Sequence, residues 1–192
     1  MLDHLPNRSS SWQFLLCMLS RSIVLIGLTG SGKTTVGKRL AKQFDCRFVD
    51  TDDVVIATTG SSVREIFELE GEPAFRAHES KALESILADD VPKVIAAAGG
   101  VVLAEQNRRA IQNSKSHVVW LDAEPANLLK RISNGSHRPL LDDNPSATLV
   151  AMSVERRGLY AELANLRVDA NGRDINEIVK VVFNYLIDQE TS

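Results

Sequence analysis

The chain has 192 residues, a length that predicts about one domain with a sizeable core. Its composition, 44% hydrophobic and 24% charged, is that of an ordinary globular protein. A net charge of -3 gives no electrostatic footprint for nucleic acid, so we expect no nucleic-acid partner. Local arginines could still bind an anion, because such a site needs only a few placed charges.

The first 20 residues differ from the rest. Residues 12–19 are apolar but far too short to span a bilayer, and we expect no membrane partner. Three interpretations of residues 1–20 stay open: a weak signal peptide that lacks a cleavage site, a lead before a true start at Met18, and an extra helix packed on the domain. The two cysteines, Cys17 and Cys46, have no metal-ligand companions, so we expect free thiols and a cytoplasmic protein.

From residue 21 onward, short apolar runs alternate with helical patterns. This alternation is typical of an α/β domain with a parallel sheet covered on both faces. The predicted strands are residues 22–27, 47–50, 93–97, 117–121 and 167–169. The predicted helices are residues 33–44, 72–87, 125–132 and 175–187. Two segments interrupt the alternation: residues 53–90, which we expect to form a small helical insertion, and residues 134–147, whose turn formers indicate a mobile lid loop.

A phosphate-binding motif follows the first predicted strand. Residues 27–34 read Gly-Leu-Thr-Gly-Ser-Gly-Lys-Thr and fit G-x-x-x-x-G-K-[ST], between an apolar strand and an amphipathic helix. In this pattern the glycines let backbone N–H groups converge on phosphate oxygens, Lys33 reaches the β- and γ-phosphates, and the Thr34 hydroxyl coordinates Mg²⁺. The motif therefore predicts that ATP and Mg²⁺ bind here. Neither the N-K-x-D segment of GTPases nor a strand ending in Asp-Glu is present, and the small size favours a small-molecule kinase.

Carboxylates follow the second predicted strand, at Asp50, Asp52 and Asp53. Ligands of doubly wound folds bind at the carboxyl ends of strands, so we expect these side chains to face the P-loop. On extended chain, Asp50 and Asp52 would point the same way. One could then serve the hydrated metal while the other orients an acceptor hydroxyl. Asp53 precedes an apolar run and could instead cap a helix.

Four further motifs follow in a fixed order. They are Phe75-Arg76 in the helical insertion, Ala98-Gly99-Gly100 after the third predicted strand, Arg138-Pro139-Leu140-Leu141 in the lid loop, and Arg156-Arg157-Gly158-Leu159-Tyr160 beyond it. Each arginine alone is more often a solvated surface charge. Their order and spacing relative to the P-loop carry the information.

Together with the P-loop and Asp50-Thr51-Asp52, these motifs resemble the shikimate kinase family over residues 23 to about 185. The resemblance implies a three-layer P-loop kinase fold, with a five-stranded parallel sheet in the order 2-3-1-4-5 and helices on both faces. It implies one domain over residues 21–192, with a substrate-binding insertion at about 53–90 and a lid at about 134–147. It also implies a monomer that transfers the γ-phosphate of ATP to the 3-hydroxyl of shikimate.

The resemblance assigns a role to each motif residue. The implied catalytic residues are Lys33, Asp52 and Arg138. The implied nucleotide-binding residues are Gly30, Ser31, Gly32, Lys33, Thr34, Thr35 and Arg138, with Arg131 and Arg173 near the adenine. Mg²⁺ would be held by Thr34 and, through water, by Asp50. Shikimate would be held by Asp52, Arg76, Gly99, Gly100 and Arg156, with the two arginines clamping its carboxylate, since a guanidinium matches a carboxylate bidentately.

Two positions depart from the family pattern. Ala98 replaces the first glycine of G-G-G, and Gly158 replaces the proline before Leu-Tyr. If position 98 needs a positive φ, alanine would cost on the order of 1 kcal/mol, whereas a need for small size alone would tolerate it. We expect Gly158 only to loosen the chain after Arg156.

Two alternative functions stay open. A kinase for another polyol acid, such as gluconate, keeps the P-loop but gives no reason for the arginine motifs. The second alternative is a nucleotide-binding regulatory module that has lost turnover, and the change to Ala98 would be the first sign of that loss. The presence of Lys33, Asp52 and the substrate-side arginines argues against such a module, and a shikimate-dependent ATPase assay separates it from a kinase.

Overall fold

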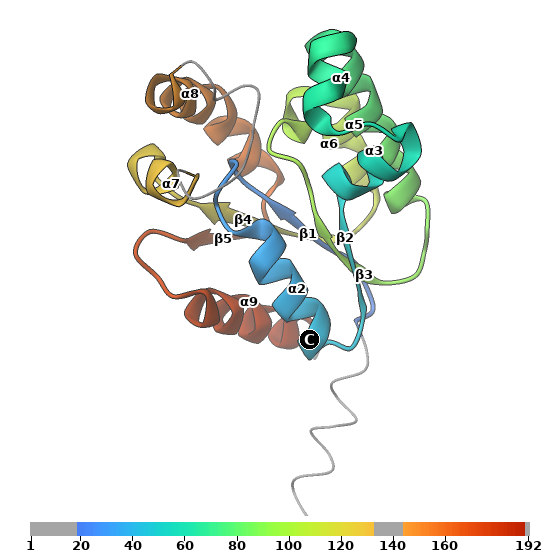
Figure 1. Cartoon of the computed structure of the whole chain (residues 1–192). Helices are drawn as coiled ribbons and strands as arrows, with labels where there is room; N and C mark the ends of the chain where they lie inside the picture. The colour runs from blue at the N-terminus through green and yellow to red at the C-terminus, as the bar shows by residue number, and fades with distance from the viewer. Residues whose placement is uncertain (1–18, 133–143, 191–192) are drawn as a thin grey trace, which may run out of the picture.

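A single parallel sheet forms the centre of the molecule (Figure 1). The computed structural model describes residues 19–132 and 144–190. The strand order is β2-β3-β1-β4-β5, as predicted. The strands are β1 (Ile23–Ile26), β2 (Arg47–Asp50), β3 (Lys93–Ala96), β4 (His117–Asp122) and β5 (Leu166–Asp169). Every strand end lies within one residue of its prediction.

Helices cover both faces of this sheet. They are α2 (Lys33–Gln43), α3 (Thr51–Thr59), α4 (Val63–Leu69), α5 (Gly71–Leu87), α6 (Glu105–Asn113), α7 (Pro125–Ile132), α8 (Pro145–Leu163) and α9 (Ile175–Glu190), with a 3₁₀ turn η1 (Val101–Leu103). Helices α2 and α9 pack side by side, while α5, α6 and α8 contact one another in a row. The four predicted helices correspond to α2, α5, α7 and α9, whereas α6 and α8 were not predicted.

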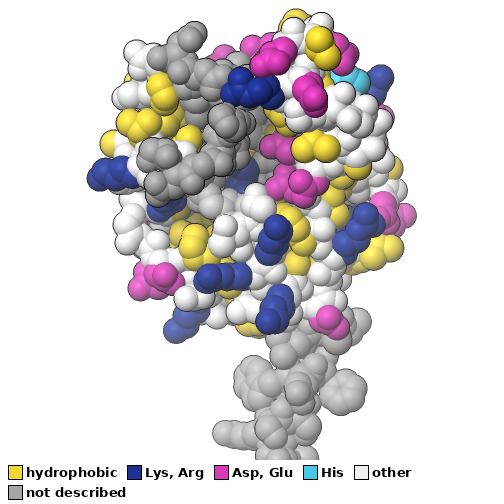
Figure 2. All heavy atoms as spheres, in the orientation of Figure 1, with side chains coloured by type: hydrophobic (Ala, Val, Ile, Leu, Met, Phe, Trp, Pro, Cys, Tyr) yellow, Lys and Arg dark blue, Asp and Glu magenta, His cyan; other side chains and the backbone are white. Residues whose placement is uncertain are grey.

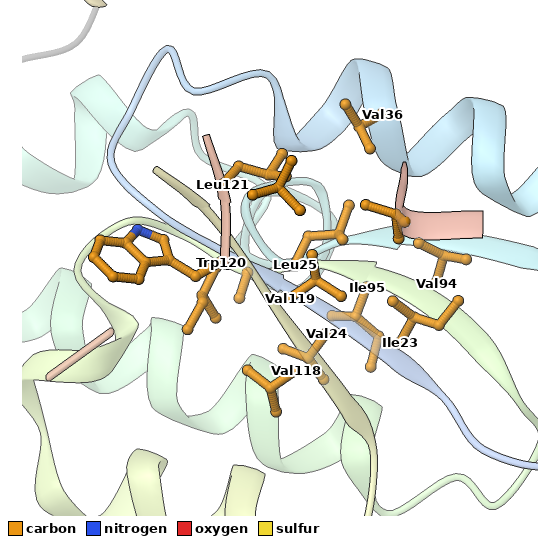
Figure 3. Packing of buried hydrophobic residues seen from close by; sticks show 14 of the residues in the cluster. Ile23, Val24, Leu25, Val36, Val94, Ile95, Val118, Val119, Trp120 and Leu121 are labelled. Atoms are coloured by element: carbon orange, nitrogen blue, oxygen red, sulfur yellow. The ribbon is translucent and has the colours of Figure 1, made fainter. Parts of the chain in front are cut away.

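The main core surrounds the central strand β1. Its four residues, Ile-Val-Leu-Ile, are all buried, because β1 is paired with β3 and β4 and has helices on both sides. Figure 3 shows Val24 and Val118 pointing away from Val36 of α2, toward the opposite helical layer. An unbroken apolar run is therefore what this position in the sheet requires.

Helices α3, α4 and α5 form the predicted helical insertion and have a small core of their own. This second core contains Val55, Ile66, Phe75 and Ala82, and the rings of Phe67 and Phe75 lie 4.7 Å apart. The surface of the insertion is acidic, with Glu65, Glu68 and Glu70 exposed, and Figure 2 shows acidic side chains gathered over this part of the molecule. The insertion thus packs partly as a separate unit above the sheet.

Two helix starts differ from prediction. Helix α3 begins at Thr51, because Asp50 Oδ1 accepts a hydrogen bond of 3.1 Å from Asp52 N. Asp50 is therefore the capping residue, and the expectation that Asp53 caps the helix was wrong.

Helix α8, which was not predicted, begins within the segment that was expected to be a lid loop. The side chain of Asn144 accepts from Ala147 N at 3.1 Å, and a proline in the first turn lacks only an N–H that has no helical partner. Residues 145–147 are thus helical, not part of a loop. Residues 134–143 of the predicted lid, with Arg138, lie outside the described residues.

The described chain packs against the domain from Leu19. This side chain is buried in the main core, and Ser20 N donates to Glu190 Oε1 at 3.3 Å. The predicted extension therefore joins the domain two residues before its expected boundary, while residues 1–18, with Cys17, lie outside the described residues. Within the described ranges, no helix is both long and apolar enough to cross a membrane.

Gly158 lies inside α8, so the expectation that it loosens the chain was wrong. A Cβ added there would meet no atom within 4 Å. We expect Gly158→Ala to raise the free energy of unfolding by about 1 kcal/mol, because glycine costs that much in a helix interior. Urea unfolding measures this effect. Gly60→Ala is the control and should lower stability, since Gly60 has φ 72. No gain at position 158 would contradict the expectation.

Candidate functional site

The loop between β1 and α2 has a backbone that only glycine permits at its first position. Gly27 has φ 140, and a Cβ there would lie 2.6 Å from the carbonyl oxygen of Leu121 in β4. The loop's own carbonyls hold the lysine of the motif. Lys33 Nζ donates to Gly27 O at 2.7 Å and to Leu28 O at 3.0 Å. The ammonium group is therefore kept inside the loop that the motif predicts to bind phosphates.

A pocket of about 400 Å³ opens in front of this loop. It is lined by residues from the loop, from the ends of β2 and β3, and from the segment before α9: Gly30, Gly32, Lys33, Thr34, Thr35, Asp50, Asp52, Ala96, Ala97, Ala98, Gly99, Arg131, Arg173, Asp174 and Ile175. Of the predicted nucleotide residues that the structure describes, every one lines it except Ser31, which is buried beneath the loop. Residues 140 positions apart in sequence thus meet at one edge of the sheet.

Thr34 and Asp50 form an oxygen pair at the base of this pocket. Thr34 Oγ1 donates to Asp50 Oδ2 at 2.8 Å. A hydroxyl and a carboxylate are ligands that suit Mg²⁺, which usually takes few protein ligands and completes its shell with water and phosphate. Within residues 19–132 and 144–190, no cluster of three His, Cys, Asp or Glu side chains could hold a metal by itself. The pair therefore fits a magnesium ion that arrives with a nucleotide.

Arg131 and Arg173 reach the same pocket from α7 and from the segment before α9. Arg131 Nη2 donates to Ala170 O at 2.7 Å. Its Nη1 is buried and has no hydrogen-bond acceptor within the described ranges. A buried donor of this kind favours an added acceptor. The geometry brings both arginines to the pocket, as expected, and their contact with an adenine stays a prediction.

Asp50 and Asp52 do not lie on one extended chain. Asp50 ends β2, whereas Asp52 lies in the first turn of α3, because the helix begins directly after the strand. The expectation that the two side chains point the same way from a strand was therefore wrong. Both still line the pocket, since the strand end and the helix start are adjacent.

A second pocket of about 340 Å³ lies between α5, η1 and α6. Its lining residues are Glu72, Pro73, Arg76, Glu79, Ser80, Gly100, Leu103, Ala104 and Asn107. The predicted shikimate residues are thus divided: Asp52 and Gly99 line the P-loop pocket, and Arg76 and Gly100 line the second one. Arg156, which is buried in α8, lines neither.

Arg76 is held by two carboxylates of its own helix. Its Nη1 donates to Glu79 Oε2 at 2.6 Å, and its Nε and Nη2 donate to Glu72 Oε1 at 3.1 and 2.8 Å. Burial alone would lower the pKa of Arg76, but the charges and hydrogen bonds of Glu79 and Glu72 raise it. Glu79 is 3% exposed, and burial raises its pKa although Arg76 acts in the opposite direction. The guanidinium is therefore charged and oriented before any acceptor binds.

The loop after β3 accommodates Ala98 without strain. Among the described residues other than glycine, only Asp45 and Lys115 have a positive φ. The backbone at position 98 is therefore not left-handed, and alanine is compatible with it. The buried Thr51 hydroxyl accepts from Ala98 N at 2.8 Å and donates to Ala96 O at 3.4 Å. The start of α3 thus supports this loop from one side.

Sequence analysis missed three residues that shape the acceptor side. Glu72 and Glu79 stand four residues before and three residues after Arg76, a helical spacing that could have identified them as its partners. The role of Thr51 in holding Ala98 N is a long-range contact, and no local pattern indicates it.

Comparisons with known proteins agree with this geometry. The model of the family described as shikimate kinase matches residues 29–187. The chain belongs to the shikimate kinase family. A shikimate kinase of Symbiobacterium thermophilum is 42% identical over 86% of this chain and 95% of its own length. One of Francisella tularensis subsp. holarctica is 37% identical over 88% of this chain and 97% of its own length.

The fold also matches that of a solved shikimate kinase structure. The enzyme of Acinetobacter baumannii, solved in complex with shikimate, superposes with a TM-score of 0.84 at 29% identity, covering 90% of this chain and 96% of that one. The predicted family, fold and enzyme class, an ATP-dependent kinase, are thereby confirmed.

Proposed function

We propose that this protein transfers the γ-phosphate of ATP to the 3-hydroxyl of shikimate, giving shikimate 3-phosphate and ADP. One observation carries the proposal most directly: Lys33, Thr34, Asp52 and Gly99 line a single pocket. This shared lining supports the proposal, because it combines a lysine, a hydroxyl suited to Mg²⁺ and a carboxylate suited to an acceptor hydroxyl. The relationship to shikimate kinases over most of the chain supports shikimate as the acceptor.

In this proposal the residues act mainly by positioning and charge stabilisation, which phosphoryl transfer needs more than covalent chemistry. Lys33 neutralises charge on the β- and γ-phosphate oxygens. Asp52 accepts hydrogen bonds from ring hydroxyls and aligns the attacking one. Arg76 and Arg156 bind the carboxylate, and Arg138 would add positive charge at the transferred group. Closing the site against water would keep water from acting as the acceptor.

The proposed metal is Mg²⁺, bound by Thr34 directly and by Asp50 through water. When bound, it neutralises phosphate charge and orients the phosphates of ATP. The proposed working form is a monomer in the cytoplasm, with no nucleic-acid or membrane partner. The free thiol of Cys46 is compatible with such a reducing compartment.

This function is tested by measuring ADP release with different candidate phosphate acceptors. ADP release from Mg·ATP should be stimulated strongly by shikimate and remain at the level without acceptor when gluconate is added, because only shikimate presents a ring carboxylate matched to two arginines. The same assay without Mg²⁺ should show no turnover. Stimulation by gluconate instead would indicate another polyol acid kinase. ATP binding with no acceptor-dependent turnover would indicate a nucleotide-binding module and contradict the proposal.

A further inference from the structure

Tyr160 lies between two parts of the proposed acceptor site, the loop after β3 and Arg156 of α8. It lies on α8, four residues after Arg156, so the two side chains share one face of the helix. Both are buried, with Tyr160 1% and Arg156 6% exposed. The Tyr160 ring also stacks near Trp120 of β4, with ring centroids 5.8 Å apart. Packing therefore restricts the position of the Tyr160 ring, and with it the position of the hydroxyl.

The hydroxyl of Tyr160 lies between the loop after β3 and Arg156 of α8. It donates to the carbonyl oxygen of Gly99 at 2.6 Å. On its other side lies Arg156, whose positive charge lowers the pKa of Tyr160 against the larger effect of burial. Burial raises the pKa of Tyr160, so the phenol keeps the proton that it gives to Gly99. A single hydroxyl of α8 therefore holds the β3–η1 loop beside Arg156.

Peptide planarity gives this contact a consequence for the next residue. The carbonyl of Gly99 and the N–H of Gly100 belong to one trans peptide group and point in opposite directions. A bond that holds Gly99 O therefore sets the direction of Gly100 N–H. The preceding peptide is held separately, because Val101 N donates to Ala98 O at 3.1 Å. Tyr160 therefore holds the Gly99–Gly100 peptide group, whereas Val101 holds the Ala98–Gly99 peptide group.

Close packing leaves the loop of Gly99 and Gly100 little room to adjust if the hydrogen bond from Tyr160 is lost. A Cβ added at Gly99 would lie 3.3 Å from Thr29 N and 3.4 Å from Gly27 O of the P-loop. A Cβ added at Gly100 would lie 2.5 Å from Cζ of Arg76. The loop is thus wedged between the P-loop and Arg76, and a rotated Gly99 peptide would disturb the groups that are proposed to bind the acceptor.

We infer that Tyr160 is a positioning residue for the acceptor, which sets the orientation of the Gly99–Gly100 peptide beside Arg156. The inference rests on the proposed function, since both groups serve shikimate there. Tyr160 does not touch the nucleotide pocket, whose lining excludes it. Loss of its hydroxyl should therefore affect the acceptor and spare ATP.

The test is Tyr160→Phe, which keeps the ring and its packing but removes the hydroxyl. We expect the KM for shikimate to rise about tenfold, while the KM for ATP and kcat at saturating shikimate stay within about twofold of the unsubstituted protein. A merely structural role would lower thermal stability or the active fraction without separating the two KM values. Tyr185→Phe is the matched control: this partly buried tyrosine of α9 packs against His117 of β4, and no parameter should change.

The outcomes separate this inference from the proposed function. An unchanged shikimate KM in Tyr160→Phe, or equal changes for both substrates, would overturn the role of Tyr160 while leaving the kinase activity intact. An unsubstituted protein without shikimate-dependent turnover would overturn both. If Tyr160→Phe does not fold, 3-fluorotyrosine at position 160, a more acidic phenol and a weaker acceptor, should change the shikimate KM alone. No change there would overturn the inference equally.

Discussion

Arg76→Ala is expected to raise the KM for shikimate about 10- to 100-fold, because a charge-assisted hydrogen-bonded pair contributes about 1.5–3 kcal/mol. The KM for ATP should change little, since Arg76 does not line the P-loop pocket. Initial-rate kinetics with each substrate varied in turn measure both effects. A rise in both KM values would mean that the whole site had been disturbed.

The substitution also removes the partner of a buried carboxylate. Glu79 is 3% exposed, so without Arg76 its charge would be left buried without its hydrogen-bonded partner. The double variant Arg76→Ala/Glu79→Gln removes this charge and isolates the loss of acceptor binding. Arg64→Ala is the surface control, because Arg64 pairs with Glu68 on α4 of the same insertion at 3.5 Å. Its kinetics should match those of the unsubstituted protein.

Lys33→Met is expected to lower kcat about 100- to 1000-fold, the usual loss when a positioned group that stabilises transition-state charge is removed. Methionine preserves much of the length of the side chain but leaves the phosphate oxygens without their cation. The free energy of unfolding should change far less, because the Lys33 side chain lines the pocket and is not part of the buried core. Single-turnover phosphoryl transfer measures the effect directly.

Lys38→Met is the matched control for this variant. Lys38 lies on the same helix, is exposed, and places its ammonium 5.8 Å from the centre of the Phe48 ring. It has the same charge but no contact with the pocket. Full activity in Lys38→Met together with full activity in Lys33→Met would contradict the proposed role of the P-loop lysine.

The strands were predictable because burial on both faces leaves an unambiguous pattern, as in β1. Helices α6 and α8 lack such a pattern. Most residues of α6 are polar, and α8 exposes Val150 and Val154 on its outer face and contains Gly158. Apolar periodicity is therefore blurred in both. The start of α8 was missed because Asn-Pro is typical of turns as well as of a helix cap followed by its first turn.

For the site, sequence identified which residues are brought to the P-loop but not how they are held. The nucleotide-side residues follow a spaced motif, and the fold places most of them in one pocket. The backbone conformation at Ala98 could not be deduced, because a small residue suits several conformations. The contacts of Thr51 with Ala98 and of Tyr160 with Gly99 join segments 47 and 61 residues apart. Such contacts depend on the packed fold and leave no local signal.

The carboxylate of Asp50 contacts two different parts of the structure, the start of α3 and Thr34 of the P-loop. One carboxylate oxygen caps α3 and the other accepts from Thr34, so the start of the helix and the candidate metal site depend on the same side chain. Helix α3 carries Asp52 and opens the helical insertion. A change in the charge around Asp50 would therefore be transmitted to the helix that presents Asp52. If magnesium and nucleotide bind as proposed, occupancy of the nucleotide side and the start of α3 would share this one carboxylate.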